Sequence, residues 1–123
     1  MQDRTITTSN PILSASTLSG DKVCNALGED LGKVEDFMLD LSNGRIRYAV
    51  LSFGGFLGMG DKLFAVPPEA LRIDTENNEL ILDVERERLE NAPGFDKDHW
   101  PETSDHEWER SVYEFYGSTP YWE

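Results

Sequence analysis

The sequence predicts a mainly β protein, a small barrel or sandwich of about six short strands with short helices at its C-terminal end. Runs of strand-forming residues separated by tight turns follow one another over roughly seventy residues, which is typical of such folds. One of these turns holds the pair Asn43-Gly44 between two apolar runs, the strongest short-range signal of a hairpin. The length of 123 residues suits a single core.

The expected strands cover residues 22–25, 31–40, 46–53, 62–66, 72–74 and 79–84. The second has no clean period and contains a glycine, so we expect a bent strand with a bulge near Asp36. The third carries apolar residues on both of its alternating faces, which predicts a central strand covered on both sides. Pro67-Pro68 ends the fourth strand, and Glu69-Ala70-Leu71 fits one helical turn after it.

Composition and charge divide the chain into three parts. Residues 1–15 are rich in Ser, Thr and Asn and are expected to form a flexible N-terminal arm. Residues 16–92 hold the strands and a short helix near 85–92. Residues 93–123 carry eight acids against two bases together with all three tryptophans, so we expect an acidic, aromatic-rich extension. A helix near 105–116 is predicted there, with Asp105 as its cap and Gly117 as its end.

The formal net charge of −13 argues against nucleic acid as a direct ligand, because phosphate binding needs a basic patch and no run of Lys and Arg is present. The same charge argues against an anionic membrane surface. No apolar run is long enough to span a bilayer, and residues 1–10 lack the apolar region of a secretory signal. We therefore expect a cytoplasmic protein without direct membrane insertion.

Catalytic and metal-binding patterns are missing from the sequence. Cys24 is the only cysteine and is expected to be a small buried apolar residue. A loose cluster in the C-terminal extension lacks the spacing of calcium or zinc sites and is expected to be a polar loop with a helix cap; it comprises Asp96, Asp98, His99, Asp105 and His106. The sequence predicts no catalytic residue, no metal, no cofactor and no enzymatic activity.

Two segments are candidate interaction sites. The first is a glycine-rich run that opens onto a strand rather than a helix, unlike known phosphate-binding loops. It fits a tight strand connection, one wall of a small-molecule site, or a loop that presents apolar side chains to a partner; its residues are Gly54, Gly55, Phe56, Leu57, Gly58 and Met59. The second is the apolar stripe of the predicted C-terminal helix, which could pack on the strands or anchor a protein partner; its residues are Trp108, Val112, Phe115 and Tyr116.

Four stretches of the chain resemble the PRC-barrel family: LSGDKV (18–23), GEDLGKVED (28–36), GRIRYAV (44–50) and FGGFLGMGDKLFAVP (53–67). The segment APGF (92–95) with Trp100-Pro101 is similar to the C-terminal extension of bacterial stand-alone members. The resemblance spans roughly residues 16–101 and implies a small, strongly bent antiparallel β-barrel. Relatives include the cytoplasmic domain of the reaction-centre H subunit and the C-terminal domain of a ribosome maturation factor, neither of which is catalytic in its barrel.

From the resemblance we expect a non-catalytic protein-binding or assembly module, of a kind sometimes linked to stress responses. The alternative is a small-molecule-binding barrel in which the loop Gly54–Gly60 forms part of the site. The protein partner is not named by the sequence. A small barrel with an apolar loop and an aromatic tail also predicts a homo-oligomer, most simply a two-fold dimer.

Overall fold

The computed structural model describes residues 13–53, 62–74, 76–96, 98–102 and 105–122. The strands among them form one seven-stranded sheet with the order β5-β6-β1-β2-β3-β4-β7. The strands are β1 (Lys22–Cys24), β2 (Asp30–Asp40), β3 (Arg45–Phe53), β4 (Lys62–Val66), β5 (Leu71–Asp74), β6 (Glu79–Leu82) and β7 (Gly94–Phe95). The helices are α1 (Ala15–Leu18), α2 (Arg86–Glu90) and α3 (His106–Phe115), with the 3-10 turn η2 (Pro68–Ala70).

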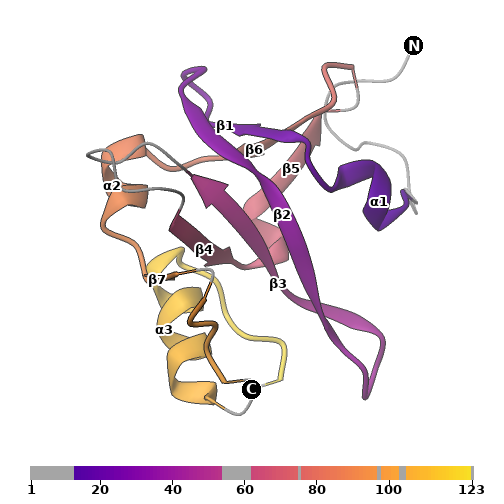
Figure 1. Ribbon diagram of the computed structural model, residues 1–123, viewed down its shortest axis with the longest axis vertical. Coiled ribbons are helices and arrows are strands. Elements are labelled where there is room, and N and C mark those ends of the chain that lie inside the picture. The colour runs from indigo at the N-terminus through magenta and orange to yellow at the C-terminus, as the bar shows by residue number, and fades with distance from the viewer. Residues whose placement is uncertain (1–12, 54–61, 75, 97, 103–104, 123) are drawn as a thin grey trace.

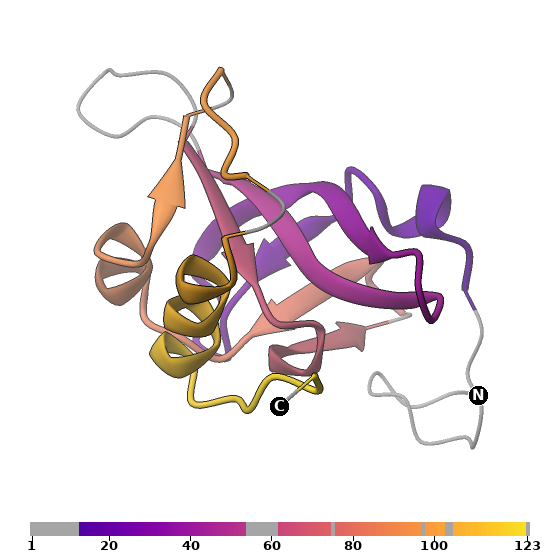
Figure 2. The ribbon, with the colours of Figure 1, turned by 90° about the horizontal axis from the view of Figure 1, so that it is seen from below.

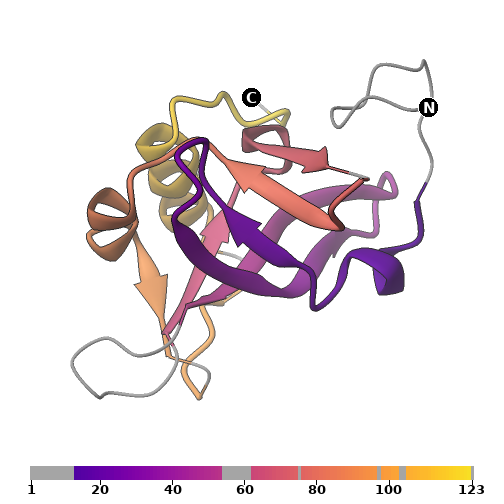
Figure 3. The ribbon, with the colours of Figure 1, turned by 90° about the horizontal axis from the view of Figure 1, so that it is seen from above.

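The mainly β class and the short helices predicted from the sequence are confirmed, and six of the seven strands lie where they were expected. The sheet is strongly curled, as Figures 2 and 3 show. Its end strands are β5 and β7, and among the described residues no ladder joins them, so the closed barrel is not seen as a closed ring of hydrogen bonds.

The expectation of a wholly antiparallel sheet is wrong at one pair, because β1 runs parallel to β6. A tight hairpin forces its two strands to be antiparallel, whereas a long connection does not. The chain reaches β6 from β1 only after passing through four other strands, so no turn fixes their relative direction. The sequence did not predict two of the elements. One is α1, which begins at the last residue of the predicted arm, and the other is the two-residue β7 in the C-terminal extension.

Strands β2 and β3 form the long twisted hairpin that crosses the molecule in Figure 1. The expected hairpin turn is present, but it is a four-residue loop in which only Gly44 has a positive φ, of 74°. The backbone N–H of Gly44 donates to the carbonyl oxygen of Asp40 at 2.8 Å. The predicted bulge is also present, because the register between β2 and β3 shifts between Val34 and Asp36.

Two apolar clusters lie on opposite faces of β3 and β4. Ala49, Leu51 and Phe53 point into the curl of the sheet and pack with residues of β1, β2, β6 and α2. Tyr48 and Val50 point the other way, toward α3. The sequence-based prediction that β3 is covered on both faces is confirmed. Figure 2 shows α3 lying against this outer face, beside α2.

Helix α3 begins and ends as the sequence predicts. The Asp105 carboxylate accepts from the backbone N–H of Trp108 at 3.0 Å, and Gly117 has a φ of 72° just after the last turn. Val112 and Tyr113 are each only 1% exposed. The helix is therefore an integral layer of the fold and not an appendage to it. None of the described helices has the length and apolar character to cross a membrane.

Candidate functional site

Arg47 owes its direction to a second irregularity in the β2–β3 ladder. Met38 lies opposite Tyr48 and Leu39 opposite Ile46, so Arg47 is the extra residue on β3. A bulge of this kind re-aims a side chain that regular alternation would send to the other face. The Arg47 guanidinium accordingly meets α3, on the same side as Tyr48.

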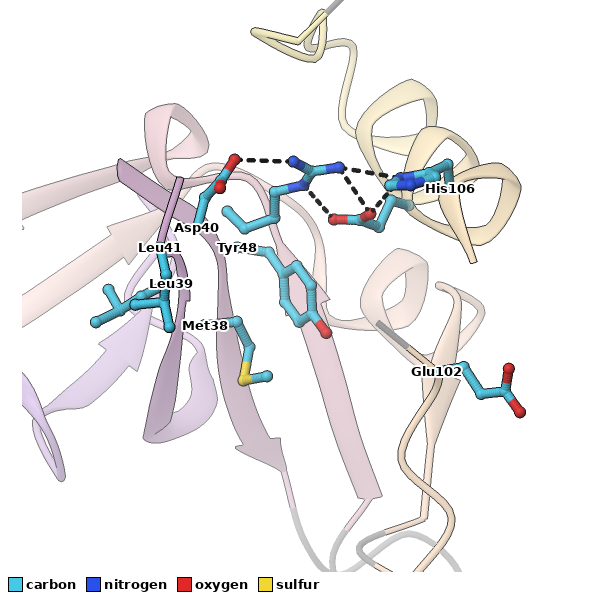
Figure 4. A pocket seen from close by; sticks show the side chains of 9 residues that line it. Met38, Leu39, Asp40, Leu41, Tyr48, Glu102 and His106 are labelled. Atoms are coloured by element: carbon cyan, nitrogen blue, oxygen red, sulfur yellow. Dashed lines mark hydrogen bonds and ion pairs between the residues drawn. The ribbon is translucent and has the colours of Figure 1, made fainter. Parts of the chain in front are cut away.

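The guanidinium of Arg47 bonds to residues of both β2 and α3, and Figure 4 draws these bonds as dashed lines. Its Nε and Nη2 donate to the two carboxylate oxygens of Glu109 at 2.7 and 3.1 Å, a bidentate pair. Nη1 donates to Oδ2 of Asp40 at 3.0 Å, and Nη2 also lies 3.1 Å from Nδ1 of His106. The side chain of Glu109 is only 6% exposed, so most of this charge is held away from water.

The C-terminal segment closes over the same arginine. The centre of the Trp122 ring lies 3.6 Å from the Arg47 guanidinium carbon, and the centre of the Tyr121 ring lies 4.0 Å from that of Arg45. The Tyr121 hydroxyl donates to Oδ2 of Asp40 at 2.5 Å. Tyr113 donates a hydrogen bond to the backbone carbonyl of Arg47. The cluster therefore ties the hairpin, α3 and the chain end together.

Hydrogen bonding fixes the charges of this cluster. Donors from Ser42, Tyr121 and Arg47 hold the pKa of Asp40 well below its usual range. Burial opposes the charge of Arg47, but its bonds to Glu109, Tyr121 and Asp40 outweigh burial and raise its pKa. Neither group can exchange a proton near neutral pH. The cluster is a fixed, saturated set of charges, which is unlike an acid–base catalytic pair.

A hollow of about 170 Å³ lies beside the cluster, between the hairpin and the segment that leads into α3. Met38, Leu39 and Leu41 line its hairpin side (Figure 4). Asp40, Arg47, Glu109 and His106 form the wall toward α3, and Glu102 lies at the opposite rim. Tyr48 stands between the apolar and polar parts, and burial followed by the nearby Glu109 charge raises the pKa of its hydroxyl.

Large apolar side chains are exposed next to this hollow. Leu41 is 88% exposed in the hairpin loop, Leu39 is 59% exposed on β2, and its cross-strand partner Ile46 is 37% exposed. We call these three residues the hairpin patch. A second, wider hollow of about 480 Å³ lies between α1 and β2, and Leu39 also lines it. The side chain of Leu39 thus lies between the two hollows and lines both of them.

The interaction residues predicted from the sequence fall into two groups. The glycine-rich loop, with Gly54, Gly55, Phe56, Leu57, Gly58 and Met59, lies outside the described residues. The helix stripe packs inside the molecule: Val112 and Trp108 belong to the outer cluster, Phe115 packs on the inner one, and Tyr116 touches both. Of the two uses weighed for this stripe, the structure shows packing on the strands.

Sequence reasoning missed the hairpin patch and the Arg47 cluster. The sequence indicates a bent strand that includes Leu39, and it marks neither Leu41 nor Ile46 as exposed, because nothing in the local pattern predicts the second bulge, between Met38 and Leu39. His106 was placed in a loose Asp/His cluster, but it lies beside Arg47, while His99 pairs with Asp96 at 3.8 Å on the surface. Cys24 is partly buried, with Glu79 3.6 Å from its sulfur.

Comparison with known proteins places most of this fold in one family. The family model described as PRC-barrel domain matches residues 11–89. No curated protein matches the chain. The matched region contains the hairpin patch and Arg47, whereas Glu102, His106, Glu109, Tyr121 and Trp122 lie beyond it. The candidate site therefore combines the family domain with the C-terminal extension.

Proposed function

The chain belongs to the PRC-barrel domain family, and on that premise we propose that it is a non-catalytic protein-binding module whose contact surface is the hairpin patch. The curl of the sheet in Figures 2 and 3 supports the barrel form that the family name describes. The proposal holds whether the bound protein is a second copy or a different chain.

The observation that carries the proposal is the clustering of exposed apolar side chains. Six large apolar residues are exposed in the described part of the chain, and three of them, Leu39, Leu41 and Ile46, share one hairpin. Single exposed apolar residues are ordinary, but a contiguous set is typical of an interaction surface. The hairpin is also braced by the Arg47 cluster next to its turn, so its shape is set before any partner binds, which lowers the cost of binding.

Size and chemistry favour a protein over a small molecule at this place. Sites for drug-sized ligands usually enclose about 300–1,000 Å³, and the hollow beside the patch holds about 170 Å³. The wider hollow near α1 is lined by only one charged residue, Asp36, with two serines and apolar groups. Neither hollow presents a nucleophile held by a base.

The test is site-specific photocrosslinking in cells of the organism that makes the protein. A photoreactive phenylalanine analogue replaces Leu41 in one variant and Leu27 in the control, because Leu27 is 81% exposed and precedes the opposite end of β2. We expect discrete covalent adducts from position 41 that are missing from position 27. Identical adducts from both positions, or none from position 41, would contradict the proposal.

A further inference from the structure

We propose that the hairpin patch and the adjoining hollow bind a segment of a different protein in which apolar side chains flank a lysine or arginine. The stem of that basic side chain lies in the hollow, against Met38 and Tyr48, and its charged end faces the acidic rim. This inference rests on the proposed function and adds the chemistry of the partner to it.

The charge around the hollow favours a basic partner. Among the residues that line the hollow there are one base, Arg47, and three acids, so the charge of the lining is 1 − 3 = −2 with His106 neutral. The acids are Asp40, Glu102 and Glu109. The whole chain has the same sign, with a formal net charge of −13. Opposite charges at the rim steer a partner and fix its orientation.

Glu102 is the rim carboxylate that remains available. Asp40 and Glu109 are both bonded to Arg47, whereas the exposed Glu102 makes no ion pair among the described residues. Figure 4 shows it across from the hairpin residues, with its carboxylate pointing away from them. A long, exposed side chain of this kind can turn to meet a cation at small cost, because it is not held by other partners.

The hollow fits one long amphipathic side chain. Its volume of about 170 Å³ equals that of roughly six water molecules in the liquid. Lysine and arginine bury their alkyl stems on apolar surface while the charged end stays near water or an acid. The hollow offers both parts, with Met38, Leu39 and Leu41 on one side and carboxylates on the other. A single side chain that fills such a pocket and is surrounded by apolar contacts is typical of the residues that contribute most of the binding energy of an interface.

A second copy of this chain fits the same surface poorly. In a two-fold contact the same patch faces itself, so the acidic lining of one hollow would face the acidic lining of the other. Like charges across an interface oppose binding, and Arg47 cannot offset them because Asp40 and Glu109 already occupy its donors. The dimer predicted from the sequence would therefore need another surface.

The experiment is an NMR titration of the full chain with two matched peptides. The probe is acetyl-Leu-Arg-Leu-amide, and the control carries citrulline in place of arginine, which keeps the shape and removes the charge. We expect the arginine peptide to give saturable shifts of the Met38 methyl and Tyr48 signals. We expect the citrulline peptide, and the arginine peptide on Glu102→Gln, to bind at least about threefold more weakly, as for a partly exposed ion pair.

Leu41→Ser should abolish the shifts, and the matched control Leu27→Ser should leave them unchanged. Absence of saturable shifts, equal binding of the two peptides, or indifference to Glu102→Gln would overturn the inference. The crosslink from position 41 separates the two proposals. Adducts that contain only two copies of this chain overturn the basic partner and leave the protein-binding module in place, whereas no adduct overturns both.

Discussion

Arg47 donates to both carboxylate oxygens of Glu109, a residue 62 positions later in the chain, at 2.7 and 3.1 Å. The pair links the bulge near the turn of the β2–β3 hairpin to the only helix that covers the outer face of β3 among the described elements. It also determines the wall of the hollow where we propose that a partner binds.

Removing the arginine should destabilise the fold. Arg47→Met leaves the carboxylates of Glu109 and Asp40 without their cation, and breaking a mostly buried pair costs about 3 kcal/mol. Urea unfolding measures the change in the free energy of unfolding. Arg45→Met is the matched control, since Arg45 is exposed and loses only its stacking on Tyr121, worth about 0.5–1 kcal/mol. If both variants lost the same free energy of unfolding, the ion pairs of Arg47 would contribute no more to stability than the stacking of Arg45.

Acid should weaken the contribution of Asp40 to the stability of the folded protein. Its pKa is lowered in the folded state, chiefly by the Ser42 and Tyr121 hydroxyls, so the folded protein binds that proton less tightly than the unfolded chain. The stability that results is present above the unfolded pKa of about 3.9 and is lost as the pH falls below it. We expect the wild type to be more stable than Asp40→Asn near neutral pH, with the difference shrinking in acid. Thermal melts across pH measure this difference, and one that stays constant with pH would contradict the assignment.

Two tyrosines of the C-terminal part should respond oppositely to loss of their hydroxyls. The Tyr113 hydroxyl donates to the Arg47 carbonyl, whereas the buried Tyr116 hydroxyl has no hydrogen-bond partner among the residues that the structure describes. Tyr113→Phe should cost about 1 kcal/mol, and Tyr116→Phe should be neutral or stabilise by about 1 kcal/mol. Denaturant unfolding of both variants compares them directly. A loss of stability in Tyr116→Phe equal to that in Tyr113→Phe would be inconsistent with an unsatisfied hydroxyl.

Glycines in different surroundings should differ in their tolerance of alanine. A Cβ on Gly32 would lie 2.1 Å from the Ser52 carbonyl oxygen, at a φ of +104°, whereas a Cβ on Gly44 meets nothing within 4 Å at a φ of +74°. We expect Gly32→Ala to lose about 3 kcal/mol or more and Gly44→Ala about 1 kcal/mol. Thermal melts should therefore separate the two. Similar melting temperatures would refute the close approach of β2 to β3.

Truncation after Trp100 should disrupt the protein, because it removes α3 from the outer face of β3 and β4. Val112 and Tyr113 are almost fully buried there, and burying one such side chain contributes about 1.5–3 kcal/mol. We expect the shortened chain to unfold at much lower denaturant concentration or to associate. Circular dichroism with light scattering measures both. An unchanged midpoint and mass would mean that α3 does not support the sheet.

Local chemistry made much of this fold predictable. The Asn43-Gly44 turn, the prolines after β4, the cap at Asp105 and Gly117 after α3 act over a few residues, and each lies where the sequence placed it. Alternation in residues 46–53 also identified the two buried faces of β3. The family follows from ordered motifs that span most of the chain.

The amino-acid sequence by itself thus determined the mainly β class, the hairpin and the C-terminal helix, because turns, caps and periodicity are local properties. Only the tertiary structure decided the parallel pairing of β1 with β6 and the meeting of Arg47 with Glu109 and Trp122. These depend on which distant segments become neighbours when the sheet curls and the chain end folds back. The same curl and bulges leave Leu39 and Leu41 facing outward beside an acidic hollow, since a one-residue shift in register decides which face of a strand reaches solvent.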